Sequence, residues 1–554
     1  MATFWTGLNS PFQGDDILQI VKNVPVHSVK NIRIFFEGGT FYNGRGLAPL
    51  SGDYFRPLMS TSFSLIYSIF GPHPLYFHIF QLLLCISSAF IFYLFLRYSF
   101  KGGLSIFLAL LLLVHPIDSE MAFSIPVTQD ALYFFFGILA LYILVRFKSM
   151  RSLIGAAACL LLSLLSKETA VVFVVMSAVY LFWWDRRRLL PFIAIFALPF
   201  ALYMVLRIHA IGLLPSNPYS SPLDELSLTG RLVNAPSVIL FYFTKFVFPW
   251  KLATGYFWVY KTFSIKHVLL PLIIDLAVFG LIIYGANQLR RHSTKAMFYT
   301  YIYFAIWLAV SLLLIVHIIP VDATAAEPWF YASMVGVLGM LGVILTVWQS
   351  KVTPKYLFYS AIIILIVLGV RTALHGLDWQ SDYKLQMSSV AISKEDYVGY
   401  MDIAQDLQGQ GKLKEAELYE RQSISIFPVE FNYSNLGVIL TNEHNFPGAL
   451  NAYEQSLKYG HAYLTYEDIG ALTLFSNNYA INKAYLSQAI NLYPKDSTLW
   501  LYLALLEDRN NDNADAKISI EHAVAYGQVP SGLALSIMQN QPFNIQIVGE
   551  KVHI

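Results

Sequence analysis

Several residues near the ends of long apolar segments could do acid–base chemistry or bind a phosphate. Asp15 and Asp16 are adjacent in NSPFQGDDILQIV, and Glu120 and Asp130 stand in VHPIDSEMAFSIPVTQDAL. A Lys–Glu pair at 167–168 interrupts the apolar LLSLLSKETAVVF. A carboxylate can take the proton of an attacking hydroxyl, and a cation can stabilise a departing phosphate. The residue types therefore suit group transfer from a phosphate, if the fold brings them together.

Each of these residues also has a purely structural explanation. Asp15 and Asp16 precede an apolar stretch and could cap a helix, and Asp130 could do the same for the next helix. The 167–168 pair could reach out to the membrane interface. A single histidine at a helix end, such as His115, more often forms local hydrogen bonds than binds a metal, and the chain shows no zinc-site spacing.

The composition places most of the chain in a membrane. Of 554 residues, 56% are hydrophobic and 13% are charged, with a mean hydropathy of +0.53, whereas soluble domains carry about 25% charged residues. The two cysteines, Cys85 and Cys159, lie in apolar runs and read as core residues, which excludes a disulfide framework. The absence of a basic stripe outside short loops argues against a nucleic-acid partner.

Apolar runs predict ten membrane spans, each near the length that a bilayer requires. They lie at 74–96, 103–116, 130–147, 152–166, 169–184, 189–211, 268–288, 297–319, 328–348 and 355–373. We expect 58–71 to be an interfacial helix, and 236–258, which Pro249 breaks and which carries Lys245, to be interfacial or re-entrant.

Lysine and arginine gather in alternate loops, which identifies these as the cytoplasmic loops. The five sequences are RYSFKGG, RFKSMRS, WWDRRRLL, QLRRHSTKA and WQSKVTPKY. The candidate residues then share the outer side, together with further ionisable groups: Asp53, Asp118, Glu327, His115, Arg207 and His209. No apolar segment precedes Asp15, so we expect either that a first helix is missing from the gene model or that the first hairpin translocates a short N-terminus.

The polar part of the chain contains a repeat. Small residues recur at Ala404, Gly437, Gly470 and Ala504, spaced by 33, 33 and 34 residues. A helix–turn–helix period of about 34 residues is typical of tetratricopeptide repeats, whose concave face typically binds extended peptide. We divide the chain into a transmembrane domain at 1–375 with its first outer loop at 1–73, a linker at 376–395, about four repeats at 396–530 and a tail at 531–554.

Motifs spread along most of the chain resemble one family. In order they are GDD, YFRPLMSTSFSLIYSIFGPHPLYFHIFQLLL, LLLVHPIDSEMAFSIPVTQDAL, LLSLLSKETAVVF, YMVLRIHAIG, FYFTKFVFPWKLATGYFW and AEPWFYASMVGVLGML, followed by the repeats. The chain resembles the transmembrane and tetratricopeptide-repeat O-mannosyltransferases and their bacterial relatives, of the polytopic GT-C glycosyltransferase type. The resemblance implies an all-α protein: a GT-C-like transmembrane helical domain followed by a tetratricopeptide-repeat α-solenoid.

The resemblance also implies a reaction and roles for individual residues. A sugar, with mannose as a candidate, would pass from a polyprenyl- or dolichyl-phosphate donor to a protein or glycan acceptor on the outer side. Asp15 would act as the base, and Asp16 would structure the loop. Glu120 and Asp130 match acidic positions of the second loop in the family. Lys167 and Glu168 match a Lys–Glu pair that would bind the lipid phosphate, and Arg207 would be a further cation for that phosphate. His115 and His209 are additional candidates.

Two departures from the family pattern concern the second loop. The usual HPxHxE reads HPIDSE, with Asp118 in place of the second histidine, and Thr128 stands where an arginine is usual. No cofactor is implied with certainty, the metal ligands are unknown, and a divalent metal is left open.

The implied partners are the bilayer, the lipid-linked donor and a protein or peptide acceptor on the repeats, without nucleic acid. The protein would be a multi-pass protein of a bacterial inner membrane or an endoplasmic-reticulum equivalent, with its repeats extracytoplasmic. One alternative is a non-enzymatic envelope scaffold that recruits partners through its repeats. The other is an O-antigen ligase or polymerase, although the 212–267 loop offers only Arg231 and His267 rather than a cluster.

Overall fold

The chain forms two helical units. The computed structural model describes residues 3–42, 50–51, 54–212, 221–319, 321–348, 354–474, 479–527, 529–541, 546–548 and 551–553. One unit extends to Ser393, and the other begins at Lys394. Within the described residues the only strands are two hairpins of two- and three-residue strands, so the protein is all-α as expected.

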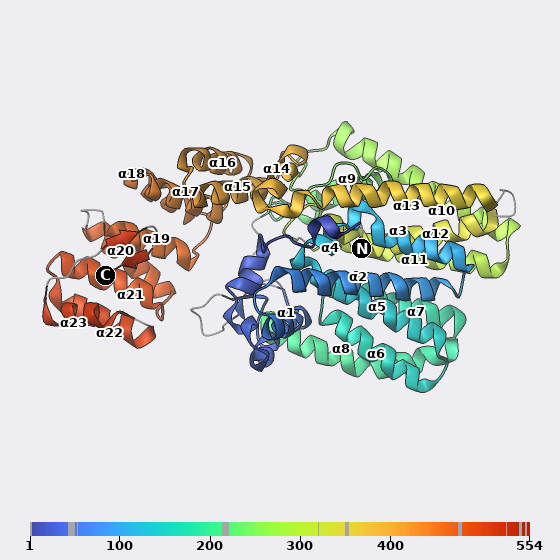
Figure 1. Ribbon diagram of the computed structural model, residues 1–554, viewed down its shortest axis with the longest axis horizontal. Helices are drawn as coiled ribbons and strands as arrows, with labels where there is room; N and C mark the ends of the chain where they lie inside the picture. The colour runs from blue at the N-terminus through green and yellow to red at the C-terminus, as the bar shows by residue number, and fades with distance from the viewer. Residues whose placement is uncertain are drawn as a thin grey trace. The chain divides into compact units, whose positions relative to one another are not determined.

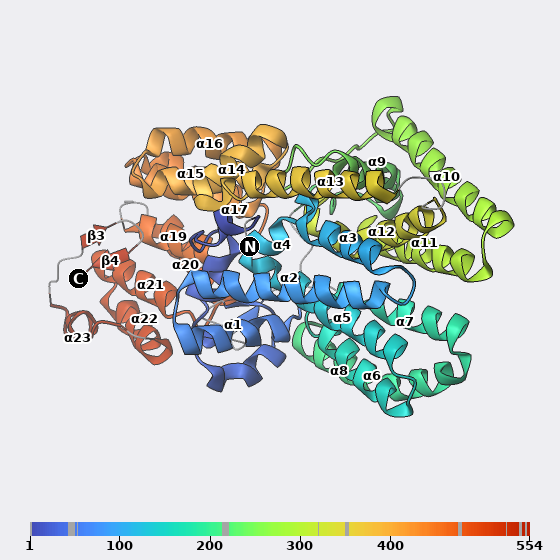
Figure 2. The ribbon, with the colours of Figure 1, turned by 45° about the vertical axis from the view of Figure 1, so that its right-hand side comes forward.

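The first unit is a bundle of apolar helices (Figures 1 and 2). Its α-helices are α1 (Pro57–Phe70), α2 (Pro74–Leu96), α3 (Gly102–Val114), α4 (Glu120–Phe123), α5 (Thr128–Arg146), α6 (Met150–Leu164), α7 (Val171–Trp184), α8 (Leu189–Ile211), α9 (Leu228–Val247), α10 (Leu270–His292), α11 (Lys295–Ile315), α12 (Tyr331–Trp348), α13 (Pro354–His375) and α14 (Asp382–Ile392).

Seven helical segments of the described chain are long and apolar enough to cross a membrane. An eighth is the pair Gly102–Val114 and Pro116–Phe123, which bends by 51°, because His115–Pro116 interrupts the helix. The expected spans at 152–166 and 169–184 form apolar helices of 15 and 14 residues, which are shorter than the roughly 20 residues that a straight crossing needs. The protein is a multi-pass membrane protein.

Close packing between α11 and α12 depends on small residues. A Cβ atom on Gly336 would lie 2.6 Å from the backbone nitrogen of Leu308, and one on Gly339 would lie 2.1 Å from the ring of Phe304. Glycine therefore lets the backbones of these two helices approach each other, as small residues do in membrane proteins. Trp307, fully buried beside them, donates a hydrogen bond to the carbonyl of Ala332 at 2.9 Å.

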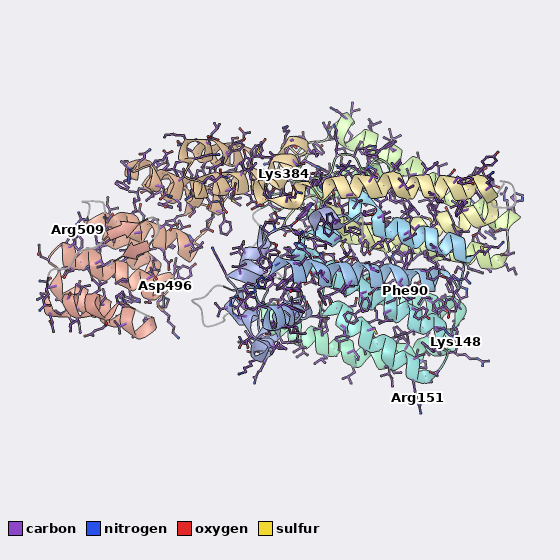
Figure 3. The ribbon with its side chains drawn as sticks, in the orientation of Figure 1. Phe90, Lys148, Arg151, Lys384, Asp496 and Arg509 are labelled. Carbon is purple, nitrogen blue, oxygen red and sulfur yellow. The ribbon has the colours of Figure 1, made fainter. Side chains whose placement is uncertain are left out.

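The basic loops lie away from the residues that precede the repeats. Lys148 and Arg151, in the loop between α5 and α6 and at the start of α6, are at one end of the bundle, and Lys384 of α14 is at the other (Figure 3). Phe90, on the side of α2, is 58% exposed, as expected of a side chain that faces lipid rather than water. These positions agree with the sorting of charge that the sequence predicts.

The segment before α1 is a small subdomain of 3₁₀ and π turns: η1 (Trp5–Gly7), η2 (Ile17–Val21), η3 (Val24–His27) and η4 (Val29–Phe36). Strand β1 (Phe41–Tyr42) pairs antiparallel with β2 (Leu50–Ser51). Ile20, Val26 and Phe35 pack in a buried cluster with Met59 and Phe63 of α1. The helix expected at 58–71 forms as α1 and packs against the segment that precedes it; its position at the membrane interface stays a prediction.

The segment expected to be a linker is largely helical. It contains η11 (Asp378–Gln380) and α14, and both lie in the first unit. Ser389 of α14 accepts a hydrogen bond from the backbone nitrogen of Thr254 at 3.1 Å. This contact holds the end of the first unit against the outer segment that follows α9.

The second unit is the repeat solenoid. Its helices are α15 (Tyr397–Gly409), α16 (Leu413–Ile426), α17 (Glu430–Asn442), α18 (Phe446–Ser456), α19 (Tyr463–Thr473), α20 (Tyr479–Leu492), α21 (Ser497–Arg509) and α22 (Asn513–Tyr526). Asp496 caps α21 by accepting hydrogen bonds from the backbone nitrogens of Thr498 and Leu499 (Figure 3). The expected tail contains α23 (Ser531–Gln539), which packs on α22, and the hairpin of β3 (Gln546–Val548) and β4 (Lys551–His553).

Candidate active site

Asp15 and Asp16 lie at the start of η2 in different environments. Asp16 is 2% exposed and accepts a hydrogen bond from the backbone nitrogen of Gln13 at 3.1 Å. The Gln13 amide in turn donates to the carbonyl of Trp379 at 3.3 Å, which ties this loop to η11. Burial raises the pKa of Asp16 well above its ordinary value. Asp16 is therefore placed to stabilise this loop.

Asp15 is exposed and faces charged groups from other segments. Loss of hydration among the surrounding protein atoms raises its pKa, the negative charge of Asp322 raises it further, and Arg56 opposes both effects. Asp322 comes from the outer segment before η10 (Glu327–Phe330). A carboxylate with a raised pKa that reaches solvent is a stronger base than an ordinary aspartate.

Arg56 lies at the centre of the charged groups around Asp15. Its side chain is 10% exposed, its Nε is 4.0 Å from Oε2 of Glu168, and its guanidinium lies 3.9 Å from the ring centre of Tyr54. Arg56 immediately precedes Pro57, the first residue of α1, so the helix start fixes where the side chain leaves the backbone.

Arg207 approaches Tyr203 and Arg56 from the C-terminal end of α8. Its Nη1 donates to the carbonyl of Gly212 at 3.1 Å, and its guanidinium also bonds to the hydroxyl of Tyr203. Tyr203 lies within electrostatic reach of both Glu168 and Arg56. Arg56 is thus within reach of Asp15 and Glu168, and Arg207 is connected to Arg56 and Glu168 through Tyr203.

Lys167 is held elsewhere. Its Nζ donates to both carboxylate oxygens of Asp130, at 2.7 and 2.8 Å. Lys167 is 8% exposed and Asp130 is 2% exposed. We expected Lys167 and Glu168 to act as a pair at the lipid phosphate, but the structure pairs Lys167 with Asp130 and places Glu168 beside Arg56. A cation that a buried carboxylate already neutralises is a poor ligand for a lipid phosphate.

A second group of carboxylates is buried deeper. Glu327 is fully buried and accepts hydrogen bonds from the hydroxyl of Tyr256 at 2.6 Å and the backbone nitrogen of Ala253 at 3.0 Å. Glu120 and Asp118 are 6% and 4% exposed and lie within electrostatic reach of Glu327. Neither oxygen of Asp118 has a hydrogen-bond partner among the described residues. These acids are inside the bundle rather than beside Asp15.

The two candidate histidines have different surroundings. His115 is 2% exposed, and its Nε2 bonds to the carbonyl of Phe246 at 2.9 Å while its Nδ1 accepts from the backbone nitrogen of Ile117. Both ring nitrogens are therefore used in local bonds. His209 lies exposed on α8.

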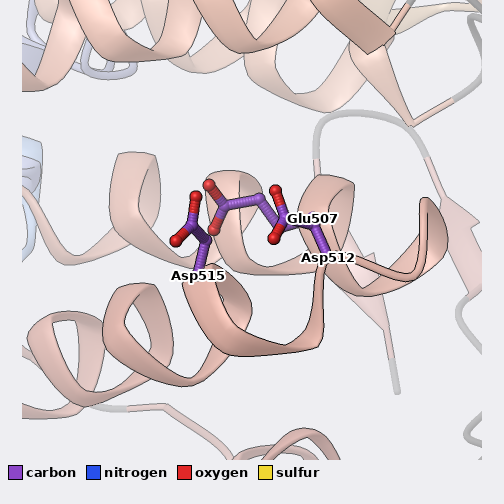
Figure 4. A group of neighbouring side chains, drawn as sticks. All are labelled: Glu507, Asp512 and Asp515. Carbon is purple, nitrogen blue, oxygen red and sulfur yellow. The ribbon is translucent and has the colours of Figure 1, made fainter.

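Among the described residues, one group of three acids is close enough to hold a metal ion: Glu507, Asp512 and Asp515 of the second unit (Figure 4). The ammonium of Lys483 lies among them, with Nζ 2.9, 3.0 and 2.8 Å from their carboxylate oxygens. Lysine thus supplies the positive charge at this position, and the group is an ion-pair network rather than a metal centre.

The sequence pattern did not single out Arg56, Tyr203 or Asp322. Arg56 stands in the quoted YFRPLM, where an arginine between an outer loop and a proline-initiated helix was a usable signal. Tyr203 is an ordinary aromatic of an apolar helix, and Asp322 stands in a short loop with no motif. Only the packing of segments distant in sequence brings Asp322 within reach of Asp15 and Tyr203 within reach of Arg56.

Comparison with known proteins supports the resemblance drawn from the motifs. Residues 56–209 match the family described as dolichyl-phosphate-mannose-protein mannosyltransferase. The chain is 28% identical over 141 residues to protein O-mannosyl-transferase Tmtc3 of Drosophila melanogaster, and 34% identical over 128 residues to protein O-mannosyl-transferase TMTC1 of Mus musculus. These matches cover 24% and 23% of this chain but 15% and 14% of the relatives' lengths.

Solved structures give lower similarity. ArnT from Cupriavidus metallidurans, bound to undecaprenyl phosphate, is 14% identical, with a TM-score of 0.36 over 80% of this chain and 76% of that one. The tetratricopeptide-repeat protein YrrB is 14% identical, with a TM-score of 0.24 over 26% of this chain and 75% of that one. The region from α1 to α8 is thus similar in sequence to polytopic protein mannosyltransferases.

Proposed function

We propose that the protein is a membrane glycosyltransferase that moves a sugar, with mannose as the first candidate, from a polyprenyl-phosphate donor to a hydroxyl of a protein acceptor. The observation that carries the proposal is the exposed carboxylate of Asp15 within electrostatic reach of Arg56, with Arg207 connected to Arg56 through Tyr203. The charge pattern assigns these helix ends to the outer side. The mannosyltransferase family that residues 56–209 match supports the donor class.

Asp15 serves as the general base in this proposal. The acceptor hydroxyl loses its proton to Asp15, and its oxygen forms a bond to the anomeric carbon. The bond between that carbon and the phosphate oxygen breaks, and the lipid phosphate leaves with the electron pair. The raised pKa of Asp15 favours this role, because a stronger base removes a hydroxyl proton more readily.

Arg56 and Arg207 supply positive charge to the leaving phosphate. Arginine presents several N–H donors in a fixed plane, which suits the oxygens of a phosphate. Glu168 keeps Arg56 in place from 4.0 Å. Lys167 and Asp130 instead support the site from behind as a buried pair, and Asp16 holds the catalytic loop against η11.

The proposal is tested by reconstitution. The purified protein in liposomes is given a short-chain polyprenyl phosphate carrying radiolabelled mannose and a peptide rich in serine and threonine. We expect labelled peptide from the wild type and from Glu37→Gln, a surface variant of the same outer loop (Glu37 pairs only with exposed Arg33 among described residues). Asp15→Asn should give none. No transfer by the wild type with mannose or any other polyprenyl-linked sugar would leave the scaffold alternative as the better account.

A further inference from the structure

The end of α13 carries a cation on the exposed side of a membrane-spanning helix. Arg371 follows Val367 by four residues and Ile364 by seven, so both apolar side chains lie within about 40° of it round the helix. Val367 and Ile364 are each 43% exposed, whereas the next residue after Arg371, Thr372, is fully buried. Arg371 therefore stands at the end of an apolar stripe, formed by Ile364 and Val367, that is open to the bilayer.

Two hydrogen bonds hold the guanidinium of Arg371 in place. Its Nε and Nη2 donate to the carbonyl of Trp250, in the segment that follows α9, at 3.2 and 2.8 Å. A cation that only extends toward water at the end of a membrane helix needs no such anchor. The two bonds use two of the five N–H donors of an arginine, and the fixed plane presents the others to the oxygens of an anion.

Two lysines bring further positive charge to this place. Lys245, near the end of α9, lies within electrostatic reach of both Arg371 and Lys251. Its Nζ donates to the carbonyl of Lys251 and to the hydroxyl of Tyr256, the latter at 2.9 Å. Lys251 itself is exposed. Carbonyl and hydroxyl oxygens thus position Arg371 and Lys245 without cancelling their charge.

The acids of this region are too few to balance the cations. Glu327 is within electrostatic reach of Lys245 and Arg371, but it is fully buried. Asp378 interacts with Arg371 and also with Lys384. With Lys251 included, four cations share two acids, so the exposed part of the group carries net positive charge.

The two chain segments that carry these cations are fixed to one break in the bundle. His115 bonds through Nε2 to the carbonyl of Phe246, the residue after Lys245, at 2.9 Å. Thr372, the residue after Arg371, donates to the carbonyl of Val114 at 2.8 Å. Val114 and His115 are adjacent at the end of α3. The spacing of the cations is therefore set before any ligand arrives, which reduces the entropy cost of binding.

Exposed apolar side chains lie between the two lysines. Val247, Phe248 and Trp250 are 60%, 64% and 55% exposed. Aromatic residues beside cations are typical of the zone where lipid headgroups meet acyl chains. The arrangement offers cations to a headgroup and an apolar stripe to the chain below it.

We propose that Arg371 and Lys251 bind the anionic phosphate headgroup of a bilayer phospholipid, whose acyl chain lies along the stripe of Ile364 and Val367. Lys245 adds positive charge from behind. A bilayer lipid fits better than the lipid-linked donor, because the stripe is on an exposed helix side that any neighbouring lipid reaches. The proposal goes beyond the proposed function, since binding here requires neither a sugar donor nor transfer.

The test is native mass spectrometry of the full-length protein, purified in detergent and given one lipid at a time without donor or acceptor. The probes are phosphatidylglycerol, phosphatidylcholine with the same acyl chains, and undecaprenyl phosphate. We expect the first phosphatidylglycerol to bind about tenfold more tightly than phosphatidylcholine. Equal affinities would overturn the proposal. Displacement of phosphatidylglycerol by equimolar undecaprenyl phosphate would assign the site to a lipid carrier and overturn it too.

Two matched variants each remove two cations at a membrane boundary. Arg371→Gln with Lys251→Gln should weaken binding of the first phosphatidylglycerol about tenfold and leave phosphatidylcholine unchanged. Arg290→Gln with Arg291→Gln, exposed at the end of α10, should weaken it less than about twofold.

Thermal unfolding verifies that both variants fold. Should the loss of the Arg371 bonds to Trp250 unfold the first variant, Lys251→Gln alone removes an exposed charge and should weaken phosphatidylglycerol binding about threefold. Equal losses in the α13 and α10 variants, or an equal loss of both phospholipids, would contradict a headgroup site at Arg371.

Discussion

The buried pair of Lys167 and Asp130 gives a quantitative prediction. Lys167 Nζ is 2.7 Å from Oδ1 of Asp130, and the two side chains are 10% and 3% exposed. With an effective dielectric constant of about 20, the attraction at that distance is about 6 kcal/mol, from which the desolvation of both charges must be subtracted. Lys167→Met or Asp130→Asn should each lower the free energy of unfolding by about 3–5 kcal/mol, because each leaves one buried charge alone.

The double variant should lose much less free energy of unfolding than the sum of the losses in the two single variants. With both charges gone no ion is stranded, so we expect a loss of about 1–3 kcal/mol and a coupling free energy of at least about 2 kcal/mol. The assay is unfolding in mixed micelles titrated with denaturing detergent, with Lys148→Met as a control for removing an exposed lysine. Additive single effects would refute the conclusion that Lys167 is held by Asp130, and would return it to the group of free phosphate cations.

Four further predictions follow from individual contacts. Arg56→Lys should raise the KM for the lipid donor and lower kcat by about 10- to 100-fold in the transfer assay, since lysine cannot supply the planar donors; unchanged kinetics would remove Arg56 from the site. Transfer by the wild type should increase with pH through a pKa above 3.8, because Asp15 must be ionised and its pKa is raised; a flat profile from pH 4 to 7 would argue against a carboxylate base.

Asp16→Asn should have a higher Tm than the wild type at pH 7, and the gap should close as pH falls toward 4. The pKa of Asp16 is raised in the folded protein, so ionisation of Asp16 destabilises the fold only when the pH rises above the ordinary pKa of an aspartate. A difference in Tm between the two proteins that widens toward acidic pH would contradict this. Gly437→Ala should destabilise the solenoid by about 1–3 kcal/mol because Tyr453 occupies the space. Gly409→Ala, where nothing lies within 4 Å, should be neutral or stabilising, and equal effects of the two would contradict the packing argument.

Much of the fold could be predicted from the sequence, because it depends on long apolar runs and on a regular repeat period. The apolar runs predicted the helices of the first unit, and the 33- to 34-residue period predicted the paired helices of the second. The helix bounds were less accessible: α6 keeps the expected length of 15 residues but begins and ends two residues earlier than expected, and α7 begins two residues later than expected, after the 3₁₀ turn η7 (Glu168–Ala170). Residues 376–395 were expected to be a linker, but they are largely helical, and Ser389 accepts a hydrogen bond from a segment more than 130 residues away.

Only part of the candidate site could be predicted from the sequence. Acidic and basic residues could be assigned to one side of the membrane by loop charge, but their pairing could not. Lys167 and Glu168 are adjacent, yet a turn in the backbone sends one to Asp130 and the other to Arg56. Asp322 could be related to Asp15 only from the structure, which brings the segment before η10 near the loop that contains Asp15, whereas Arg56 stood in a motif whose signal could have been used.

The most direct test of the central claim is a single-turnover measurement of mannose transfer from a polyprenyl phosphate to peptide in liposomes, with wild type and Asp15→Asn compared at equal donor occupancy. The account predicts that the variant binds the donor as tightly as the wild type but transfers at least about 100-fold more slowly, as expected when a general base is lost. Equal rates in the two proteins would contradict the assignment of Asp15 and, with it, the proposed active site.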